Sequence, residues 1–198
     1  MAKTSIRIGT RGSNLALAQT KIVADSLKAY HKMLDVETVP MKTLGDVLPP
    51  KRRGTVDGKS AFTGEIERQL LAGRIDAAVH SLKDLPTKLD DRLVIAATPA
   101  RGDPRDVLIS GSGLTLDRVR DGARIGTSSV RRRAQLLIIR RDLEVLELHG
   151  NLETRLRKIS EKGLDGVVLA AAGLQRLDLS QGLRSRSEER RVGKECRL

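Results

Sequence analysis

Short apolar segments with the character of β-strands alternate with longer segments of helical periodicity, and this alternation constrains the fold more than any other feature of the sequence. Strands are expected at residues 5–10, 36–41, 77–80, 93–97, 106–110, 124–126, 143–148 and 166–170. Helices are expected at residues 14–30, 63–72, 128–139, 152–159 and 171–177, with Ser13 and Ser128 placed as N-caps. Because strands that alternate with helices form βαβ units, we predict an α/β fold with mostly parallel or mixed sheets.

A cluster of breaker residues, PARGDP at residues 99–104, interrupts this pattern, which then starts again. We therefore predict two similar α/β domains, at residues 1–98 and 105–185, joined by a hinge at residues 99–104. A long loop rich in Gly, Pro and charge is expected at residues 44–60, and loops of that length are often functional. Residues 186–198 (RSEERRVGKECRL) have no apolar periodicity. We expect them to be a non-native tail that resembles a translated sequencing adapter, the alternative being a genuine disordered basic tail.

Composition narrows the cellular setting of the chain. Hydrophobic residues make up 39% of it, enough for a packed core. No apolar run approaches the roughly 18 residues of a membrane span, and the N-terminus has no apolar signal core. The single cysteine, Cys196, cannot form an internal disulfide or a multi-cysteine metal site. We therefore expect a cytoplasmic protein without a membrane segment or a metal.

Basic residues outnumber acidic ones by 37 to 25, and the formal net charge of +12 favours anionic partners. Nucleic acid is one such partner, and the three arginines at residues 131–133 could attract it. However, Tyr30 and Phe62 are the only aromatic residues, which is too few for single-strand binding by base stacking. No zinc-finger, leucine-zipper or RNA-recognition signature is present. We therefore expect no specific nucleic-acid binding.

Many polar and cationic side chains follow directly after the expected strands. Ligands of open α/β sheets bind beyond the carboxyl ends of the strands. The side chains placed there are Arg11, Lys83, Ser128, Ser129, Arg131, Arg132, His149, Arg155 and Arg176. Arginines in the first turns of a helix oppose the helix dipole, which favours an anion site over the alternative of a solvated basic face. Because guanidinium groups recognise carboxylates at two points, we predict that a small polycarboxylate or phosphate binds in a cleft between the two domains.

Asp84 is the lone carboxylate among these cations. Neighbouring positive charge keeps such a group ionised, and an ionised acid can stabilise a developing cation and exchange a proton. The alternatives for Asp84 are a salt bridge to Lys83 or a turn cap. Asp46, in the long loop, is a weaker candidate and is more typical of a turn residue. His80 is expected in a buried strand, as a core histidine.

Five segments, taken in order, resemble the porphobilinogen deaminase family, also called hydroxymethylbilane synthase. They are IRIGTRGSNLALAQT, HSLKDLPT, GTSSVRRRAQL, HGNLETRLRK and DGVVLAAAGLQRL, and the likeness covers roughly residues 5–183. HSLKDLPT together with GTSSVRR is highly specific. The resemblance implies two domains like those of periplasmic binding proteins with the active cleft between them, and a third domain that is missing here.

The resemblance also implies an activity. The family is a transferase of porphyrin and heme biosynthesis, which condenses four porphobilinogen molecules to the linear tetrapyrrole hydroxymethylbilane and releases ammonia. Its primer is a dipyrromethane bound to a cysteine of the third domain. By motif match Asp84 would be the catalytic carboxylate. The residues that would bind the acetate and propionate arms of the pyrroles are Arg11, Ser13, Lys59, Lys83, Ser129, Arg131, Arg132, Arg155 and Arg176. The expected partners are therefore small polycarboxylate pyrroles, bound by a monomer.

The chain departs from the family pattern in three places. His149 stands where the family usually has an arginine, so it is a weaker binding candidate, and Thr55 stands where a lysine is common. Cys196 lies in the suspect tail, so we expect no primer cysteine in this chain and no activity of the chain by itself. A polyanion receptor without chemistry is the alternative function, and replacing Asp84 by Ala in a restored chain would separate the two.

Overall fold

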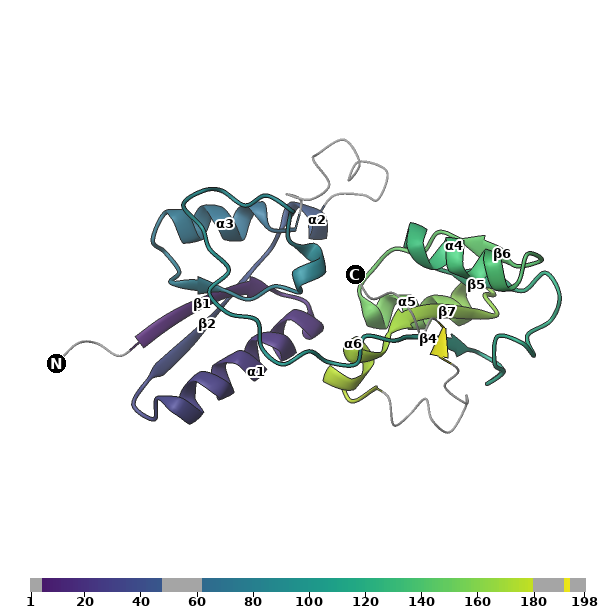
Figure 1. Ribbon diagram of the computed structural model, residues 1–198, viewed down its shortest axis with the longest axis horizontal. Coiled ribbons are helices and arrows are strands. Elements are labelled where there is room, and N and C mark those ends of the chain that lie inside the picture. Colours follow the sequence, from purple (N-terminus) through teal and green to yellow (C-terminus); the bar gives the residue numbers. More distant parts are fainter. Residues whose placement is uncertain (1–4, 48–61, 180–190, 193–198) are drawn as a thin grey trace. The chain divides into compact units, whose positions relative to one another are not determined.

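The computed structural model describes residues 5–47, 62–179 and 191–192 (Figure 1). The chain divides into two compact units, Met1–Ala100 and Arg101–Leu198. Each unit contains its own sheet with helices packed against it. Within the described part of the chain, no helix is both long enough and apolar enough to cross a membrane.

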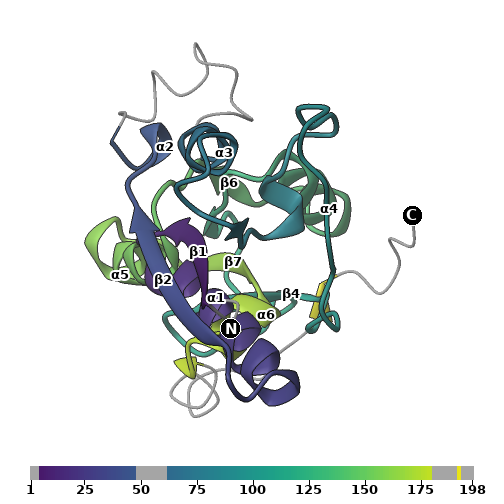
Figure 2. The ribbon, with the colours of Figure 1, turned by 90° about the vertical axis from the view of Figure 1, so that its left-hand side faces the viewer.

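The first unit is built on a three-stranded parallel sheet in the order β2-β1-β3. Helices α1 and α3 lie on opposite sides of this sheet (Figures 1 and 2). The elements in chain order are β1 (Ser5–Arg11), α1 (Asn14–Tyr30), β2 (Asp35–Met41), α2 (Leu44–Val47), α3 (Gly64–Leu71), β3 (Ala77–Ala78) and the 3₁₀ turn η2 (Leu82–Asp84).

Local sequence explains where α1 begins and how closely α3 packs. Ser13 is the N-cap of α1, because its side chain accepts a hydrogen bond from the backbone N–H of Ala16. Gly9, in β1, faces the segment before β3 at very short range and α3 at an ordinary contact distance. A Cβ atom there would lie 2.4 Å from Cδ1 of Ile75 and 3.5 Å from Cγ2 of Ile66. The missing side chain at position 9 therefore lets α3 and the segment before β3 pack directly onto the central strand.

The second unit contains a mixed five-stranded sheet in the order β6-β5-β7-β4-β8. Strand β5 runs parallel to β6 and β7, whereas β4 runs antiparallel to β7 and β8. The elements in chain order are β4 (Asp106–Ser110), β5 (Arg124–Gly126), α4 (Val130–Ile139), β6 (Glu144–Leu146), α5 (Leu152–Glu161), β7 (Gly166–Ala170), α6 (Ala171–Arg176) and β8 (Arg191–Val192).

Alternating residues of the second sheet belong to two separate hydrophobic core clusters. Val168 of β7 packs in one cluster with Ile125 and with Leu136 of α4. Its neighbour Val167 packs in the other, with Leu174 of α6 and the apolar face of α5. Because successive side chains of a strand point to opposite faces, α4 covers one face of the sheet and α5 and α6 cover the other.

The predicted α/β class with mostly parallel and mixed sheets is confirmed. The strand predicted at residues 93–97 is wrong: the segment has no strand pairing, and Val94 and Ile95 are exposed. An apolar run becomes a strand only where another strand offers it hydrogen bonds. The strand predicted at residues 77–80 shrinks to Ala77–Ala78 for a similar reason, since β3 is an edge strand that contacts β1 through two residues only.

Two further expectations need correction. His80 does not lie in a buried strand, because it follows β3 and is half-buried. The N-cap of α4 is Ser129 and not Ser128. The predicted loop at residues 44–60 begins with the short helix α2, and its remainder from residue 48 lies outside the described residues. Of the predicted tail at residues 186–198, only residues 191–192 are described, and they form β8 beside β4.

Replacing Ile125 by Ala should lower the free energy of unfolding by about 2–5 kcal/mol, because the side chain is 0% exposed and its loss leaves a cavity against Leu136. The matched control is Ile138→Ala on α4, where the side chain is 79% exposed and the change should stay within about 0.5 kcal/mol. Urea unfolding of the two variants measures the difference. Equal effects of both substitutions would contradict the assigned core.

Candidate functional site

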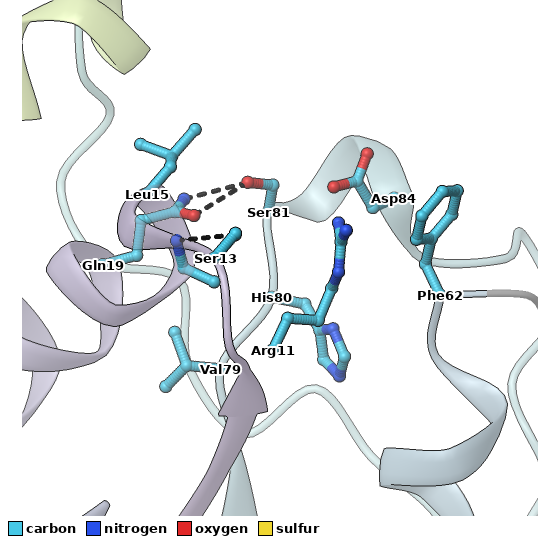
Figure 3. Close-up of a pocket in the computed structure, with 10 residues that line it drawn as sticks. Arg11, Ser13, Leu15, Gln19, Phe62, Val79, His80, Ser81 and Asp84 are labelled. Carbon is cyan, nitrogen blue, oxygen red and sulfur yellow. Dashed lines mark hydrogen bonds between the residues drawn. The ribbon is translucent and has the colours of Figure 1, made fainter. Parts of the chain in front are cut away.

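A pocket in the first unit lies beyond the carboxyl ends of β1 and β3 (Figure 3). Its volume of about 50 Å³ has room for a few water molecules or for one carboxylate arm of a ligand. Three stretches of chain line it: the end of β1 with the start of α1, Phe62 two residues before α3, and the turn after β3. Their polar or aromatic members are Arg11, Ser13, Gln19, Phe62, His80, Ser81 and Asp84.

Arg11 lies in this pocket with its guanidinium group against the ring of Phe62. Its Cζ atom lies 4.4 Å from the centroid of the Phe62 ring, a cation–π contact. In Figure 3 the guanidinium group points toward the carboxylate of Asp84. Phe62 is itself packed on Gly45 of α2, where a Cβ atom would lie 2.2 Å from the ring. The contact with α2 therefore restricts the ring of Phe62, and the ring in turn restricts the guanidinium group of Arg11.

Asp84 is half-buried at the end of η2, and the turn that carries it is tied to α1. The backbone N–H of Asp84 donates to the carbonyl of Ser81 at 2.9 Å. The Ser81 hydroxyl accepts from Nε2 of Gln19 at 2.9 Å and donates to Oε1 of the same side chain at 3.2 Å. Gln19 was not predicted from the sequence, although it lies in the same helical segment as Ser13. It fixes the turn on which Asp84 stands.

His80 lines the pocket, and its surroundings lower the pKa of its imidazole. Burial lowers the pKa of His80, and the positive charge of Arg11 lowers it further. The carboxylates of Glu67 and Asp84 raise the pKa, but by less than the burial lowers it. The imidazole of His80 therefore takes up a proton less readily than that of an exposed histidine.

In the second unit, the segment between β5 and α4 is fixed by two neighbouring serines. The Ser128 hydroxyl accepts from the backbone N–H of Leu148 at 3.0 Å and donates to the carbonyl of the same residue. It therefore joins the loop after β5 to the loop after β6. Ser129 accepts a hydrogen bond from the N–H of Arg132 and caps α4. Because the Ser128 hydroxyl is bonded to Leu148, the cap of α4 is Ser129 and not Ser128.

Arg131 and Arg132, both predicted from the sequence, converge on one carboxylate that was not. Nη2 of Arg131 lies 2.7 Å from Oδ2 of Asp106, and Nη2 of Arg132 lies 2.7 Å from Oδ1. Arg132 is buried and also donates to the carbonyl of Val168 at 3.2 Å. Arg131 is exposed and also donates to Oε1 of Gln135 at 2.9 Å. The only sequence signal of Asp106 is an acid at the head of the apolar strand DVLIS.

The loop after β6 carries His149 and is bonded to Arg155 of α5. Gly150 has a positive φ of 122°, which glycine tolerates best. Its carbonyl accepts from Nε of Arg155 at 2.9 Å. Nζ of Lys158 donates to the carbonyl of His149 at 2.8 Å, and the His149 ring lies 3.0 Å from Oε1 of Glu147. His149 is thus held at the rim of the same sheet edge as α4.

The other candidates are dispersed. Lys83 is exposed on η2. Arg176 is half-buried at the end of α6, with its Nη2 close to Gly102. Asp46 belongs to α2, but its side chain lies outside the described part, as do Lys59 and Cys196 entirely. Among the described residues, no group of three His, Cys, Asp or Glu side chains could hold a metal ion.

The two sheets and the helices packed against them define an α/β protein with a cationic edge beyond its strand ends. The fold is similar to that of the methionine-binding protein MetQ, with a TM-score of 0.51 and 15% identity, over 98% of this chain and 80% of that one. At this identity the likeness concerns the fold alone.

Sequence comparison goes further. The family model described as porphobilinogen deaminase, dipyromethane cofactor binding domain, matches residues 6–192. The chain is 51% identical to the porphobilinogen deaminase of Syntrophus aciditrophicus over 87% of its own length, and 48% identical to that of Syntrophotalea carbinolica over 91%. The chain therefore belongs to the porphobilinogen deaminase family. It spans 56% and 58% of the length of these two relatives.

The lowered pKa of His80 predicts an acid-dependent loss of stability. Below the ordinary histidine pKa of 6.5, the unfolded chain binds a proton that the folded chain does not. The free energy of unfolding of the unsubstituted chain should therefore fall more steeply between pH 7 and pH 5 than that of His80→Asn. Denaturant unfolding at pH 8.5, 7.5, 6.5 and 5.5 measures this. The difference in the free energy of unfolding between the unsubstituted chain and the variant should be constant between pH 7.5 and 8.5. If that difference stays constant down to pH 5.5, the prediction is contradicted.

Proposed function

We propose that this chain contributes the substrate- and cofactor-binding domains of a porphobilinogen deaminase, or hydroxymethylbilane synthase. In this proposal residues 1–98 and 105–185 are two lobes joined by a hinge at residues 99–104. The enzyme joins four porphobilinogen molecules into hydroxymethylbilane, within porphyrin and heme biosynthesis. The observation that carries the proposal is the pocket in which Asp84, on a turn fixed by Gln19 and Ser81, faces the guanidinium group of Arg11.

Asp84 would act on the cation that forms when ammonia leaves. The bond between the aminomethyl carbon and its protonated nitrogen breaks, the nitrogen takes the bonding electrons and departs as ammonia, and a positive charge spreads over the pyrrole ring. An ionised carboxylate that accepts a hydrogen bond from the pyrrole N–H stabilises that charge. The free α-carbon of the preceding ring then forms the new carbon–carbon bond and loses its proton, which a carboxylate or water accepts. Holding the two rings in contact is an orientation task for the other residues.

The carboxylate arms of the pyrroles would be bound by the strand-end cations and hydroxyls. Arginine binds carboxylates at two points, and the capped N-termini of α1 and α4 add backbone N–H groups and favourable dipoles. The proposed binding residues are Arg11, Ser13, Lys59, Lys83, Ser129, Arg131, Arg132, Arg155 and Arg176, with Asp46 and His149 as weaker candidates.

The same donor set fits the dipyrromethane of the family, because guanidinium and hydroxyl groups match acetate and propionate arms. When bound, that group supplies the pyrrole carbon to which the first substrate is joined. Ser129 and Arg131 would hold its carboxylates. We further propose that the protein is a cytoplasmic monomer that binds no specific nucleic acid, and that the 198-residue chain alone makes no hydroxymethylbilane.

The decisive test uses a chimera in which the Syntrophus aciditrophicus relative supplies the sequence beyond Leu183. We expect this chimera to form hydroxymethylbilane from porphobilinogen, and Asp84→Asn to lower kcat by about 10²–10³-fold through loss of charge stabilisation. Porphobilinogen binding should persist in the variant. Product is measured as uroporphyrin after acid treatment and oxidation.

The matched control is Asp91→Asn, an exposed aspartate seven residues further along the chain that does not line the pocket. It should leave turnover unchanged. Turnover by Asp84→Asn at the unsubstituted rate would remove Asp84 from the mechanism. Tight binding of porphobilinogen by a chimera that never turns it over would favour the polyanion receptor instead.

A further inference from the structure

Asp106 lies at the edge of the second sheet where β5 and β7 end, because its own strand, β4, runs in the opposite direction. It is the first residue of β4, and it pairs with Ala170, the last residue of β7. Because β4 runs antiparallel to β7, the beginning of β4 lies at the edge where the parallel strands β5 and β7 end. α4 starts from that edge, directly after β5. The carboxylate of Asp106, at the start of β4, therefore lies beside the N-terminus of α4, the helix that follows β5.

The carboxylate of Asp106 divides its two oxygens between two arginines. Oδ1 lies 2.7 Å from Arg132 and Oδ2 lies 2.7 Å from Arg131. The side chain of Asp106 is 6% exposed and that of Arg132 is 10% exposed, whereas that of Arg131 is 52% exposed. The three side chains together carry a net charge of +1, since one negative charge faces two positive ones. The cluster therefore still attracts anions after Asp106 is counted.

Arg131 would be poorly ordered without this bond. Its neighbours Arg132 and Arg133 are cations, and the positive end of the α4 dipole lies beside it. A half-exposed arginine under such repulsion samples many rotamers, and binding a ligand would then cost the entropy of fixing one of them. The bonds of Arg131 to Asp106 and Gln135 fix its guanidinium group but use only two of its five N–H donors. The remaining donors stay available to a ligand.

We propose that Asp106 is a positioning residue, which holds Arg131 in a fixed orientation at the N-terminus of α4 so that it binds a carboxylate or phosphate group of the ligand. Arg132, buried against the carbonyl of Val168, anchors the other oxygen of Asp106 and sets the direction of the carboxylate. The identity of the ligand rests on the proposed function, whereas the ordering of Arg131 does not.

The first measurement needs no ligand and no substitution. Side-chain ¹⁵N relaxation of the arginine Nε–H groups in the 198-residue chain compares Arg131 with the exposed Arg133, two residues further along the same helix. We expect a clearly higher order parameter for Arg131, falling to the level of Arg133 in Asp106→Asn. Equal mobility of Arg131 and Arg133 in the unsubstituted chain would overturn the proposal, even if Asp106→Asn fails to fold.

The second measurement titrates inorganic phosphate and porphobilinogen, each followed by calorimetry, into folded protein. Asp106→Asn should weaken binding roughly 3- to 10-fold, as expected for a side chain that must be ordered on binding. The same substitution in an Arg131→Gln background should have no further effect. Unchanged affinity in Asp106→Asn, or an equal loss in both backgrounds, would show that Asp106 is structural only.

The matched control is Asp165→Asn. Asp165 also binds an arginine, Arg120, but it precedes β7 at the opposite edge of the sheet. This control should lower thermal stability and leave both affinities unchanged, and a similar loss of affinity in it would contradict the proposal. If the unsubstituted chain binds neither probe, the proposed function fails, while the relaxation measurement still decides the role of Asp106.

Discussion

Parallel strand pairing is the constraint on which the rest of this structure depends. In a parallel pair both strands end at the same edge, so whatever follows each strand is brought together there. In the first unit the pairing of β1 with β3 places the end of β1 and the turn after β3 around one pocket. In the second unit, β5 pairs with β6 and β7 and places the starts of α4, α5 and α6 along one edge. The pocket of the first unit and the cationic edge of the second unit each follow from this pairing and not from any single motif.

Charge is distributed differently at the two edges of the sheets. Acidic residues that precede parallel strands are paired with arginines, and the pairs are structural. Arg7 donates hydrogen bonds to Asp76 and lowers the pKa of that carboxyl to about 2, and Arg120 lowers the pKa of Asp165. At the opposite edge of the second sheet, the two arginines at positions 131 and 132 face one carboxylate, that of Asp106. In the second unit the acid–arginine pair before β7 is therefore balanced in charge, whereas the cluster at the other edge keeps one excess positive charge.

Sequence patterns predicted most elements well, including the short strands at residues 106–110, 124–126 and 166–170, and failed at a few particular places. The helix after Ser13 was found with its cap and its end, because a strong apolar periodicity coincides with a capping serine. The segment at residues 93–97 is as apolar as a strand but has no strand to pair with, and nothing in its own residues reveals this. Ser128 and Ser129 are equally good caps by sequence. Only the position of Leu148, twenty residues further along the chain, decides between them.

The functional residues can likewise be separated into features that the sequence determined and features that only the tertiary structure decided. The sequence by itself determined the fold class, the family and the cationic character of the strand ends, because periodicity, motifs and charge are local properties of the chain. Only the tertiary structure decided how each charge is used. Arg131 and Arg132 are adjacent arginines of the same type, yet one is half-exposed and the other is buried. Their shared partner, Asp106, comes from an antiparallel strand more than twenty residues earlier, and the direction of a strand in a sheet is set by the packing of the whole unit and not by the residues within it.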